Sequence, residues 1–137
     1  MIEPVVPIPQ VKTAGAGAEI LLVEDNRTVG EVVSAMLEAC GHSVAWAVDA
    51  ESSLRLLDRE GGRFDLAILD VVLPGMNGVA LARLIRNQWP AVRVVLVSGY
   101  SDVLAGTEAA EFEVMHKPYS PERLAQVLNG TDKRIGW

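Results

Sequence analysis

Short apolar runs rich in branched residues alternate with longer segments of helical periodicity from about Glu19 onward. Alternation of this kind indicates β/α units and therefore a parallel sheet. The middle runs are apolar almost throughout, which is typical of strands that helices cover on both faces. We expect a doubly wound α/β sandwich whose five parallel strands are Ile20–Val23, Ser43–Val48, Phe64–Leu69, Val92–Val97 and Glu113–His116.

Residues that favour helix ends flank five expected helices. Gly41 and Gly61 stand where C-terminal caps belong. The helix at roughly Asp102–Ala110 must be short, because the 18 residues between Ser98 and Lys117 must also hold a strand. The other four helices have N-terminal caps. These are Asn26 before Arg27–Ala39, Asp49 before Ala50–Arg59, Asn77 before Gly78–Asn87, and Ser120 with Pro121 before Glu122–Leu128.

The length of 137 residues suits one domain with a substantial core. The first 18 residues combine three prolines with the run Ala14-Gly15-Ala16-Gly17-Ala18, and this composition buries too little apolar surface to offset chain entropy. We interpret residues 1–18 as a flexible tail or linker, residues 19–130 as the folded domain, and residues 131–137 as a C-terminal tail.

Charge and hydropathy exclude several classes of partner. A net charge of −6 without a Lys or Arg cluster argues against direct binding to nucleic acid. The apolar runs are far shorter than the roughly 20 residues that cross a bilayer, and the N-terminus lacks the basic residues of a secretory signal. We therefore expect a cytoplasmic protein without membrane insertion. Cys40 is the single cysteine, which excludes an intramolecular disulfide, and we expect it in the core.

Polar and charged side chains follow four of the expected strands. Glu24 and Asp25 follow the first, Asp70 the third, Ser98 the fourth and Lys117 the fifth. In an open parallel sheet, ligands bind beyond the carboxyl ends of the strands, so we expect these side chains to converge. Three carboxylates in one place need a positive partner, and hard oxygen ligands in an open cage suit Mg²⁺ shared with phosphate oxygens.

These residues are the parts that phosphoryl transfer requires. A carboxylate can act as a covalent nucleophile toward a phosphoryl group, and the transfer needs mainly alignment and charge neutralisation. Asp70 is placed to attack. Lys117 and the Ser98 hydroxyl would each cover one oxygen of the migrating group, and Mg²⁺ a third. Each residue alone has a commoner structural explanation, such as turn or cap chemistry, and their combination carries the interpretation.

Four segments resemble the receiver domains of response regulators in two-component signalling, and the resemblance covers about residues 19–130. It implies a flavodoxin-like sheet with strand order 2-1-3-4-5. The segments are Leu22-Val23-Glu24-Asp25-Asn26, Leu69-Asp70-Val71-Val72-Leu73-Pro74-Gly75-Met76-Asn77-Gly78, Val97-Ser98-Gly99-Tyr100 and His116-Lys117-Pro118-Tyr119.

The resemblance implies that Asp70 accepts a phosphoryl group from a histidine kinase or a histidine phosphotransfer protein. The domain would then relay a conformational signal to a protein partner. It would not be an enzyme in the usual sense, although it would assist its own phosphorylation and slow dephosphorylation. The resemblance also implies a cis peptide between Lys117 and Pro118. The implied Mg²⁺ contacts are Asp25, Asp70, the backbone carbonyl of Val72 and, largely through water, Glu24.

Two departures from the family concern the signal that follows phosphorylation. Receivers often carry an aromatic residue three positions before the lysine, where this chain has Val114. Phe112 would face the same side of the strand, two residues earlier. We therefore expect an atypical output face. Val72 and Tyr100 flank the approach of a hydrolytic water, and neither side chain would orient it, so we expect slow self-dephosphorylation.

Three glycines and two histidines complete the candidate residues. We interpret Gly75 and Gly78 as structural and Gly99 as leaving room at the site, and we expect neither His42 nor His116 to bind a metal.

Two alternatives stand beside the phospho-acceptor. One is a pseudo-receiver that only binds partners, and the other is a nucleotide- or flavin-binding enzyme on the same architecture. The enzyme is disfavoured because carboxylates follow the first strand where a phosphate cradle needs glycines. The Ser98-Gly99-Tyr100 segment is similar to receivers of hybrid histidine kinases and to some stand-alone receivers. Output through another polypeptide, a parent chain or a homodimer stays open.

Overall fold

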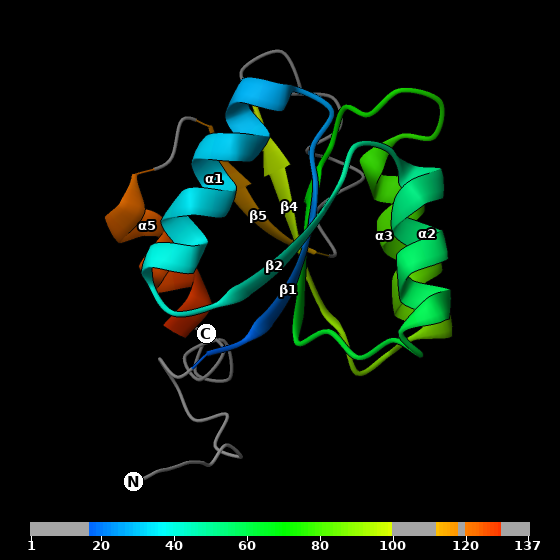
Figure 1. Cartoon of the computed structure of the whole chain (residues 1–137). Coiled ribbons are helices and arrows are strands. Elements are labelled where there is room, and N and C mark those ends of the chain that lie inside the picture. The colour runs from blue at the N-terminus through cyan, green and yellow to red at the C-terminus, as the bar shows by residue number, and fades with distance from the viewer. Residues whose placement is uncertain (1–16, 100–111, 118–119, 130–137) are drawn as a thin grey trace, which may run out of the picture.

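A computed structural model of the chain describes residues 17–99, 112–117 and 120–129. Within these ranges the chain forms five strands and four helices, which alternate as far as β4 (Figure 1). In chain order they are β1 (Glu19–Val23), α1 (Arg27–Ala39), β2 (Ser43–Ala47), α2 (Ala50–Arg59), β3 (Leu66–Asp70), α3 (Gly78–Gln88), β4 (Arg93–Ser98), β5 (Glu113–His116) and α5 (Pro121–Asn129). The expected helix at Asp102–Ala110 lies outside the described residues.

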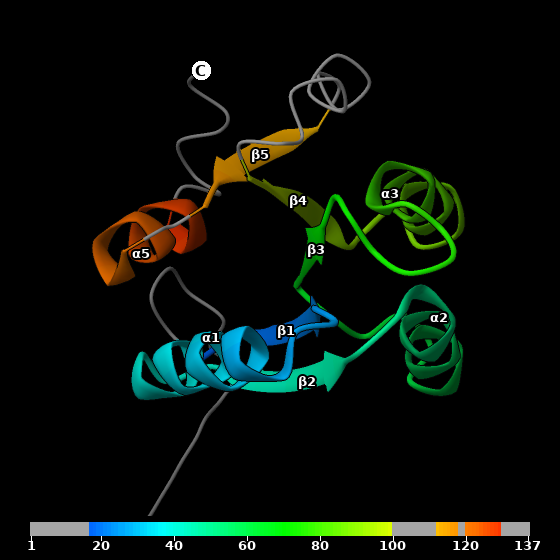
Figure 2. The same cartoon turned by 90° about the horizontal axis from the view of Figure 1, so that it is seen from above.

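The five strands form one parallel sheet in the order β2-β1-β3-β4-β5. Helices α1 and α5 cover one face of the sheet, and α2 and α3 cover the other (Figure 2). The doubly wound sandwich and the strand order expected from the sequence are therefore confirmed.

Two hydrophobic clusters fill the spaces between the sheet and its helices. Alternate residues of β1 point to opposite faces, so Leu21 and Val23 belong to one cluster and Ile20 and Leu22 to the other. Strand β3 is buried at every position. Burial on both faces explains why the middle strands are apolar along most of their length.

Side-chain caps begin the first three helices where the sequence predicts. The Oδ1 atoms of Asn26, Asp49 and Asn77 accept hydrogen bonds from backbone N–H groups three residues later, at 2.8–3.0 Å. Gly41 and Gly61 follow α1 and α2 with φ of 94° and 66°, the left-handed conformation that glycine adopts without strain. These helix ends are confirmed.

Strands β3 and β4 begin later than the sequence predicts. The backbone N–H of Phe64 bonds to the carbonyl of Gly62, and that of Val92 bonds to the carbonyl of Trp89, so both residues lie in turns. Both side chains are nevertheless buried. Their apolar character reflects burial in the hydrophobic core and not membership of a strand.

The expectation that Cys40 is a core residue is wrong, because Cys40 is exposed. Helix α1 ends at Ala39, and Cys40 caps it as the chain turns away at Gly41. The buried stripe of α1 ends one turn earlier, at Leu37. In the described part of the chain, no helix is both long enough and apolar enough to span a membrane.

Candidate functional site

Four strand ends meet at one edge of the sheet, as the sequence predicts. Asp70 ends β3 and Ser98 ends β4, while Glu24 and Lys117 directly follow β1 and β5. The backbone N–H of Lys117 donates to the carbonyl oxygen of Ser98 at 2.8 Å, which fixes these two residues side by side. The strands are parallel and in register, so their carboxyl ends place these side chains in one neighbourhood.

Three carboxylates gather at this edge. One oxygen from each of Glu24, Asp25 and Asp70 lies within 4.8 Å of the other two, a grouping that could hold a metal ion. Glu24 and Asp70 are only 5% and 6% exposed, whereas Asp25 is exposed. The cluster therefore has a buried floor and one side open to solvent.

Lys117 supplies the cluster with a positive charge. Its Nζ lies 2.8 Å from Oδ2 of Asp70 and 3.7 Å from Oε1 of Glu24. Burial lowers the pKa of Lys117, but the hydrogen bond and the charges of the two carboxylates together outweigh burial and raise the pKa above its ordinary value. The ammonium therefore stays charged at neutral pH.

The second oxygen of Asp70 is also held. Its Oδ1 accepts a hydrogen bond from the backbone N–H of Val72 at 3.0 Å. Both oxygens of this carboxylate are thus bonded, one to an ammonium and one to the loop that follows β3. This pair of contacts fixes the orientation of the Asp70 side chain.

Burial and like charge raise the pKa of Glu24. Desolvation is the largest cause, and the neighbouring carboxylates of Asp70 and Asp25 act in the same direction. The backbone N–H of Asn26, 3.0 Å from Oε2 of Glu24, and the Lys117 ammonium only partly offset them. The raised pKa of Glu24 therefore reflects chiefly its burial, with a smaller contribution from the like charge of the cluster.

Sequence reasoning missed Trp46, which supports the acidic turn from β2. Its indole N–H donates to the backbone carbonyl oxygen of Glu24 at 2.8 Å. The backbone N–H of Glu24 in turn donates to the carbonyl oxygen of Ala47 at 3.0 Å. The only sequence signal was a tryptophan in a short strand, which by itself does not identify the group that the indole contacts.

Two glycines shape the loop between Asp70 and α3. A Cβ atom on Gly78 would lie 2.1 Å from the carbonyl oxygen of Asp70 and 2.7 Å from Cα of Val71, so only glycine lets α3 approach the end of β3. Gly75 has a φ of 81°, which a turn requires. The structural interpretation of both residues agrees with this geometry.

Ser98 is buried, and its hydroxyl makes a long contact of 3.4 Å to the carbonyl of Gly99. Among the described residues, the hydroxyl therefore has no strong hydrogen bond that would have to break before it bonds to another group. Pro118 and Tyr100 lie outside the described residues, so neither the cis peptide nor the flank of the hydrolytic path is tested.

Val114 and Phe112 pack against the same hydrophobic cluster, as expected for positions two residues apart on a strand. The guanidinium of Arg86 lies 4.4 Å from the centroid of the Phe112 ring. Phe112 thus contacts α3 at the start of β5, away from Lys117 at its end. His42 accepts a hydrogen bond from the backbone N–H of Ala18, which satisfies its Nδ1.

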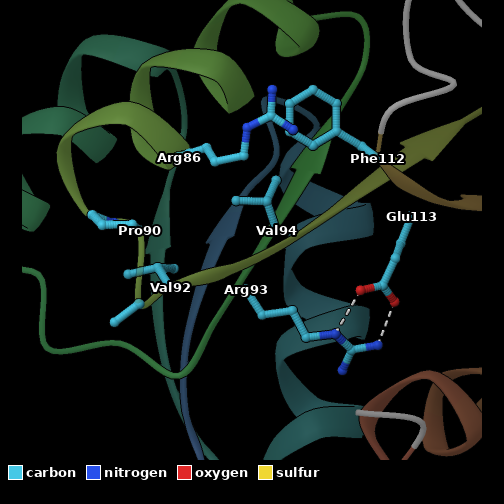
Figure 3. A pocket seen from close by; sticks show the side chains of 8 residues that line it. Arg86, Pro90, Val92, Arg93, Val94, Phe112 and Glu113 are labelled. Atoms are coloured by element: carbon cyan, nitrogen blue, oxygen red, sulfur yellow. Dashed lines mark hydrogen bonds and ion pairs between the residues drawn. The ribbon is translucent and has the colours of Figure 1, made fainter. Parts of the chain in front are cut away.

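A cavity of about 340 Å³ opens at the other end of β4 and β5 (Figure 3). Arg93 and Glu113 on its wall form a two-pronged ion pair, and Arg93 also donates to the carbonyl oxygen of Val127 in α5. The charges of this pair are therefore neutralised by contacts within the domain. The cavity lies at the start of the strands, whereas the candidate chemical groups lie at their ends.

Comparisons with known proteins identify the family of the chain. The family model for the response regulator receiver domain matches residues 20–129. The chain is 36% identical over 114 residues to the response regulator protein FleR of Pseudomonas aeruginosa and 34% identical over 114 residues to the sensor kinase CckA of Brucella abortus. These matches cover 81% of this chain but only 24% and 12% of those two proteins.

A solved structure shows the same fold. The response regulator receiver domain protein from Clostridium thermocellum superimposes with a TM-score of 0.79 at 25% identity, covering 87% of this chain and 97% of that one. The resemblance read from the sequence is therefore confirmed. The chain belongs to the response regulator receiver domain family of two-component signal transduction.

Proposed function

We propose that the chain accepts a phosphoryl group on Asp70 from the phosphohistidine of a histidine kinase or a histidine phosphotransfer protein. The observation that carries this proposal is the placement of Asp70, a buried carboxylate within 4.8 Å of two others and 2.8 Å from the Lys117 ammonium. Family membership supports the same role, because receiver domains take phosphoryl groups from histidine kinases.

The donor set fits Mg²⁺. Carboxylate oxygens are the hard ligands that this ion prefers, and the exposed side of the cluster leaves room for the water molecules that it retains. We propose Asp25, Asp70 and the backbone carbonyl of Val72 as direct ligands, with Glu24 acting largely through water. The bound ion would neutralise charge on the phosphoryl oxygens during transfer.

The chain's own residues would carry out the transfer. An oxygen of Asp70 forms the new O–P bond as the N–P bond of the donor phosphohistidine breaks and the imidazole leaves. Lys117 moves its hydrogen bond from the Asp70 carboxylate to an oxygen of the arriving group, and the Ser98 hydroxyl, weakly engaged in this structure, donates to another. Burial of Asp70 and Ser98 limits the access of water.

The experiment uses acetyl phosphate with Mg²⁺ and measures the intact mass of the chain. We expect the mass of one phosphoryl group to be added, with Asp70→Asn or removal of Mg²⁺ abolishing the gain. Asp58→Asn, an exposed carboxylate on α2, is the matched control and should be phosphorylated normally. Beryllofluoride should bind the same site in place of the phosphoryl group.

Failure of this experiment would favour the pseudo-receiver alternative. An absent mass gain in a folded chain, or a gain that survives Asp70→Asn, would contradict the proposal.

Where Asp70 is phosphorylated, timed phosphotransfer from purified kinases and phosphotransfer proteins identifies the donor, because the cognate protein reacts fastest.

The output of the domain is also a proposal. The chain spans about a quarter of FleR and an eighth of CckA, so we propose residues 19–130 as a receiver unit whose signal passes to a parent chain, a partner or a second copy. The contact of Phe112 with Arg86, together with Val114 in place of an aromatic residue, supports an atypical output face.

A further inference from the structure

Trp46 lies on β2 opposite Leu22 of β1, at the position next to the last pair of this ladder. From there its half-buried side chain reaches past the end of β1, and the indole N–H donates to the carbonyl oxygen of Glu24 at 2.8 Å. A residue on the edge strand of the sheet therefore contacts the turn that carries two carboxylates of the acidic cluster.

Helix α1 has a gap that the indole fills. A Cβ atom on Gly30 would lie 2.0, 2.2 and 2.7 Å from three ring atoms of Trp46, so any side chain at this position would displace the ring. Glycine within a helix lowers helix stability relative to alanine. Gly30 is buried in the first turn of α1, so its presence there is explained by the space that the ring occupies.

The indole and the β2 backbone together fix both polar groups of the Glu24 backbone. The N–H of Glu24 donates to Ala47, and the carbonyl accepts from Trp46. That carbonyl belongs to the peptide that joins Glu24 to Asp25. Fixing the plane of this peptide also fixes the direction in which the backbone presents Asp25, the exposed carboxylate of the cluster.

We infer that Trp46 is a positioning residue for the cation site, with Gly30 as the residue that admits its ring. This inference rests on the proposed function, because it takes the cluster of Glu24, Asp25 and Asp70 to bind Mg²⁺. The indole holds the turn in the conformation that brings the three carboxylates within reach of one ion. Trp46 itself touches neither the ion nor the phosphoryl group.

The test is Mg²⁺ binding by Trp46→Phe, measured by isothermal titration calorimetry without any phosphoryl donor. Phenylalanine keeps most of the apolar packing and removes the N–H donor. We expect the dissociation constant for Mg²⁺ to rise roughly three- to tenfold, the effect of one hydrogen bond, while the chain stays folded. Trp89→Phe is the matched control, since Trp89 packs against Gly62 at the far end of α3, and it should bind Mg²⁺ normally.

A spectroscopic readout separates positioning from general loosening. In the ¹⁵N-labelled wild-type chain, the Trp46 indole N–H resonance should shift during a MgCl₂ titration with the same dissociation constant as calorimetry gives. The Trp89 indole resonance should not shift. Gly30→Ala keeps the tryptophan but displaces its ring, so it should weaken Mg²⁺ binding to a similar degree and move the Trp46 resonance before any metal is added.

Unchanged Mg²⁺ affinity in Trp46→Phe or in Gly30→Ala would overturn the inference and leave the proposed function standing. An equal loss of affinity in Trp89→Phe would also overturn it, because the effect would then be general. A folded wild-type chain that binds no Mg²⁺ at millimolar concentration would instead contradict the proposed function, and the inference with it.

Discussion

The ammonium of Lys117 lies 2.8 Å from Oδ2 of Asp70, nearer than the 3.7 Å that separates it from Oε1 of Glu24. The proposed phosphoryl acceptor is therefore also the nearer of the two ion-pair partners of Lys117. Replacing one partner of this pair should affect rate and metal binding in different ways.

Lys117→Met should slow phosphorylation by acetyl phosphate about 100-fold, because one charged donor to the migrating group is lost. The dissociation constant for Mg²⁺ should stay the same or fall, because the ammonium no longer competes with the ion for Asp70. Initial rates by intact mass and Mg²⁺ titration measure the two effects separately. Weaker Mg²⁺ binding in a folded Lys117→Met chain would contradict this assignment.

A second ion pair lies at the opposite end of the sheet. Arg93 and Glu113 are 8% and 17% exposed, and Arg93 also donates to α5. Arg93→Met leaves the Glu113 carboxylate without this partner in a mostly buried place, so the free energy of unfolding should fall by about 2–4 kcal/mol. Urea denaturation measures the change.

The matched control for Arg93 is the exposed pair of Arg55 and Glu51 on α2, with side chains 68% and 82% exposed. Arg55→Met should cost less than about 0.5 kcal/mol, because water already solvates both charges. Equal losses for the two substitutions would show that burial does not set the strength of the Arg93 pair.

Local patterns predicted the strands, the helices and the doubly wound layers because they act within single elements, whereas the strand order came from the resemblance to receiver domains. The apolar runs, the side-chain caps at Asn26, Asp49 and Asn77, and the glycines after α1 and α2 each depend on residues a few positions apart. The site followed from the same patterns, because polar residues at the ends of parallel strands share one edge of the sheet.

Contacts between distant residues could not be predicted in this way. The bond from Trp46 to Glu24 spans 22 residues, and that from Arg93 to Glu113 spans 20, so both depend on strand register. Cys40 shows the same limit at a helix end. The apolar pattern of α1 continues to Cys40 in the sequence, but the helix ends at Ala39 and Cys40 is exposed.

Gly78→Ala should destabilise the chain by about 1–3 kcal/mol, although alanine favours helices. The new Cβ would lie 2.1 Å from the carbonyl oxygen of Asp70, so α3 or the end of β3 must move. Phosphorylation by acetyl phosphate should also slow, because the acceptor shifts with its backbone. Thermal unfolding and initial rates measure the two effects.

Gly75→Ala is the control for Gly78. It lies in the same loop at a φ of 81°, with no atom within 4 Å of an added Cβ. Its cost should be that of a left-handed alanine, about 1–2 kcal/mol, with little effect on phosphorylation rate. A phosphorylation rate in Gly78→Ala equal to that of Gly75→Ala would argue against the close approach as the reason for glycine.

His42 should make stability depend on pH. Burial lowers its pKa from the ordinary 6.5, and its Nδ1 accepts the N–H of Ala18, which requires the neutral ring. The unfolded chain therefore binds a proton more readily than the folded one. The contribution of His42 is fully present above pH 6.5 and is lost as the pH falls through the lowered value.

The variant His42→Asn keeps a hydrogen-bond acceptor but does not titrate. Urea denaturation is measured between pH 5 and pH 8, a range of about three units around the histidine pKa. The wild type should lose stability relative to His42→Asn only on the acid side of this range. A constant difference across the range would mean that His42 does not titrate differently in the folded and unfolded chains.

Val72 should control the lifetime of the phosphorylated state. Its side chain is 58% exposed, and its backbone N–H bonds to Oδ1 of Asp70, so the side chain stands beside the acceptor and faces water. An asparagine there could donate to or accept from a water molecule that approaches the phosphoryl group. Val72→Asn should therefore shorten the lifetime roughly three- to tenfold, the effect of one well-placed hydrogen bond.

Val48→Asn is the matched control, because Val48 is a valine of similar exposure, 50%, that follows β2 at the same edge of the sheet. It should leave the lifetime unchanged. The measurement follows the loss of phosphoryl mass after the donor is removed, with Mg²⁺ held constant. An unaltered lifetime in Val72→Asn, or an equal change in Val48→Asn, would mean that the side chain next to the acceptor does not limit the approach of water. The slow step would then lie in the groups that hold the phosphoryl oxygens, Lys117 and Ser98.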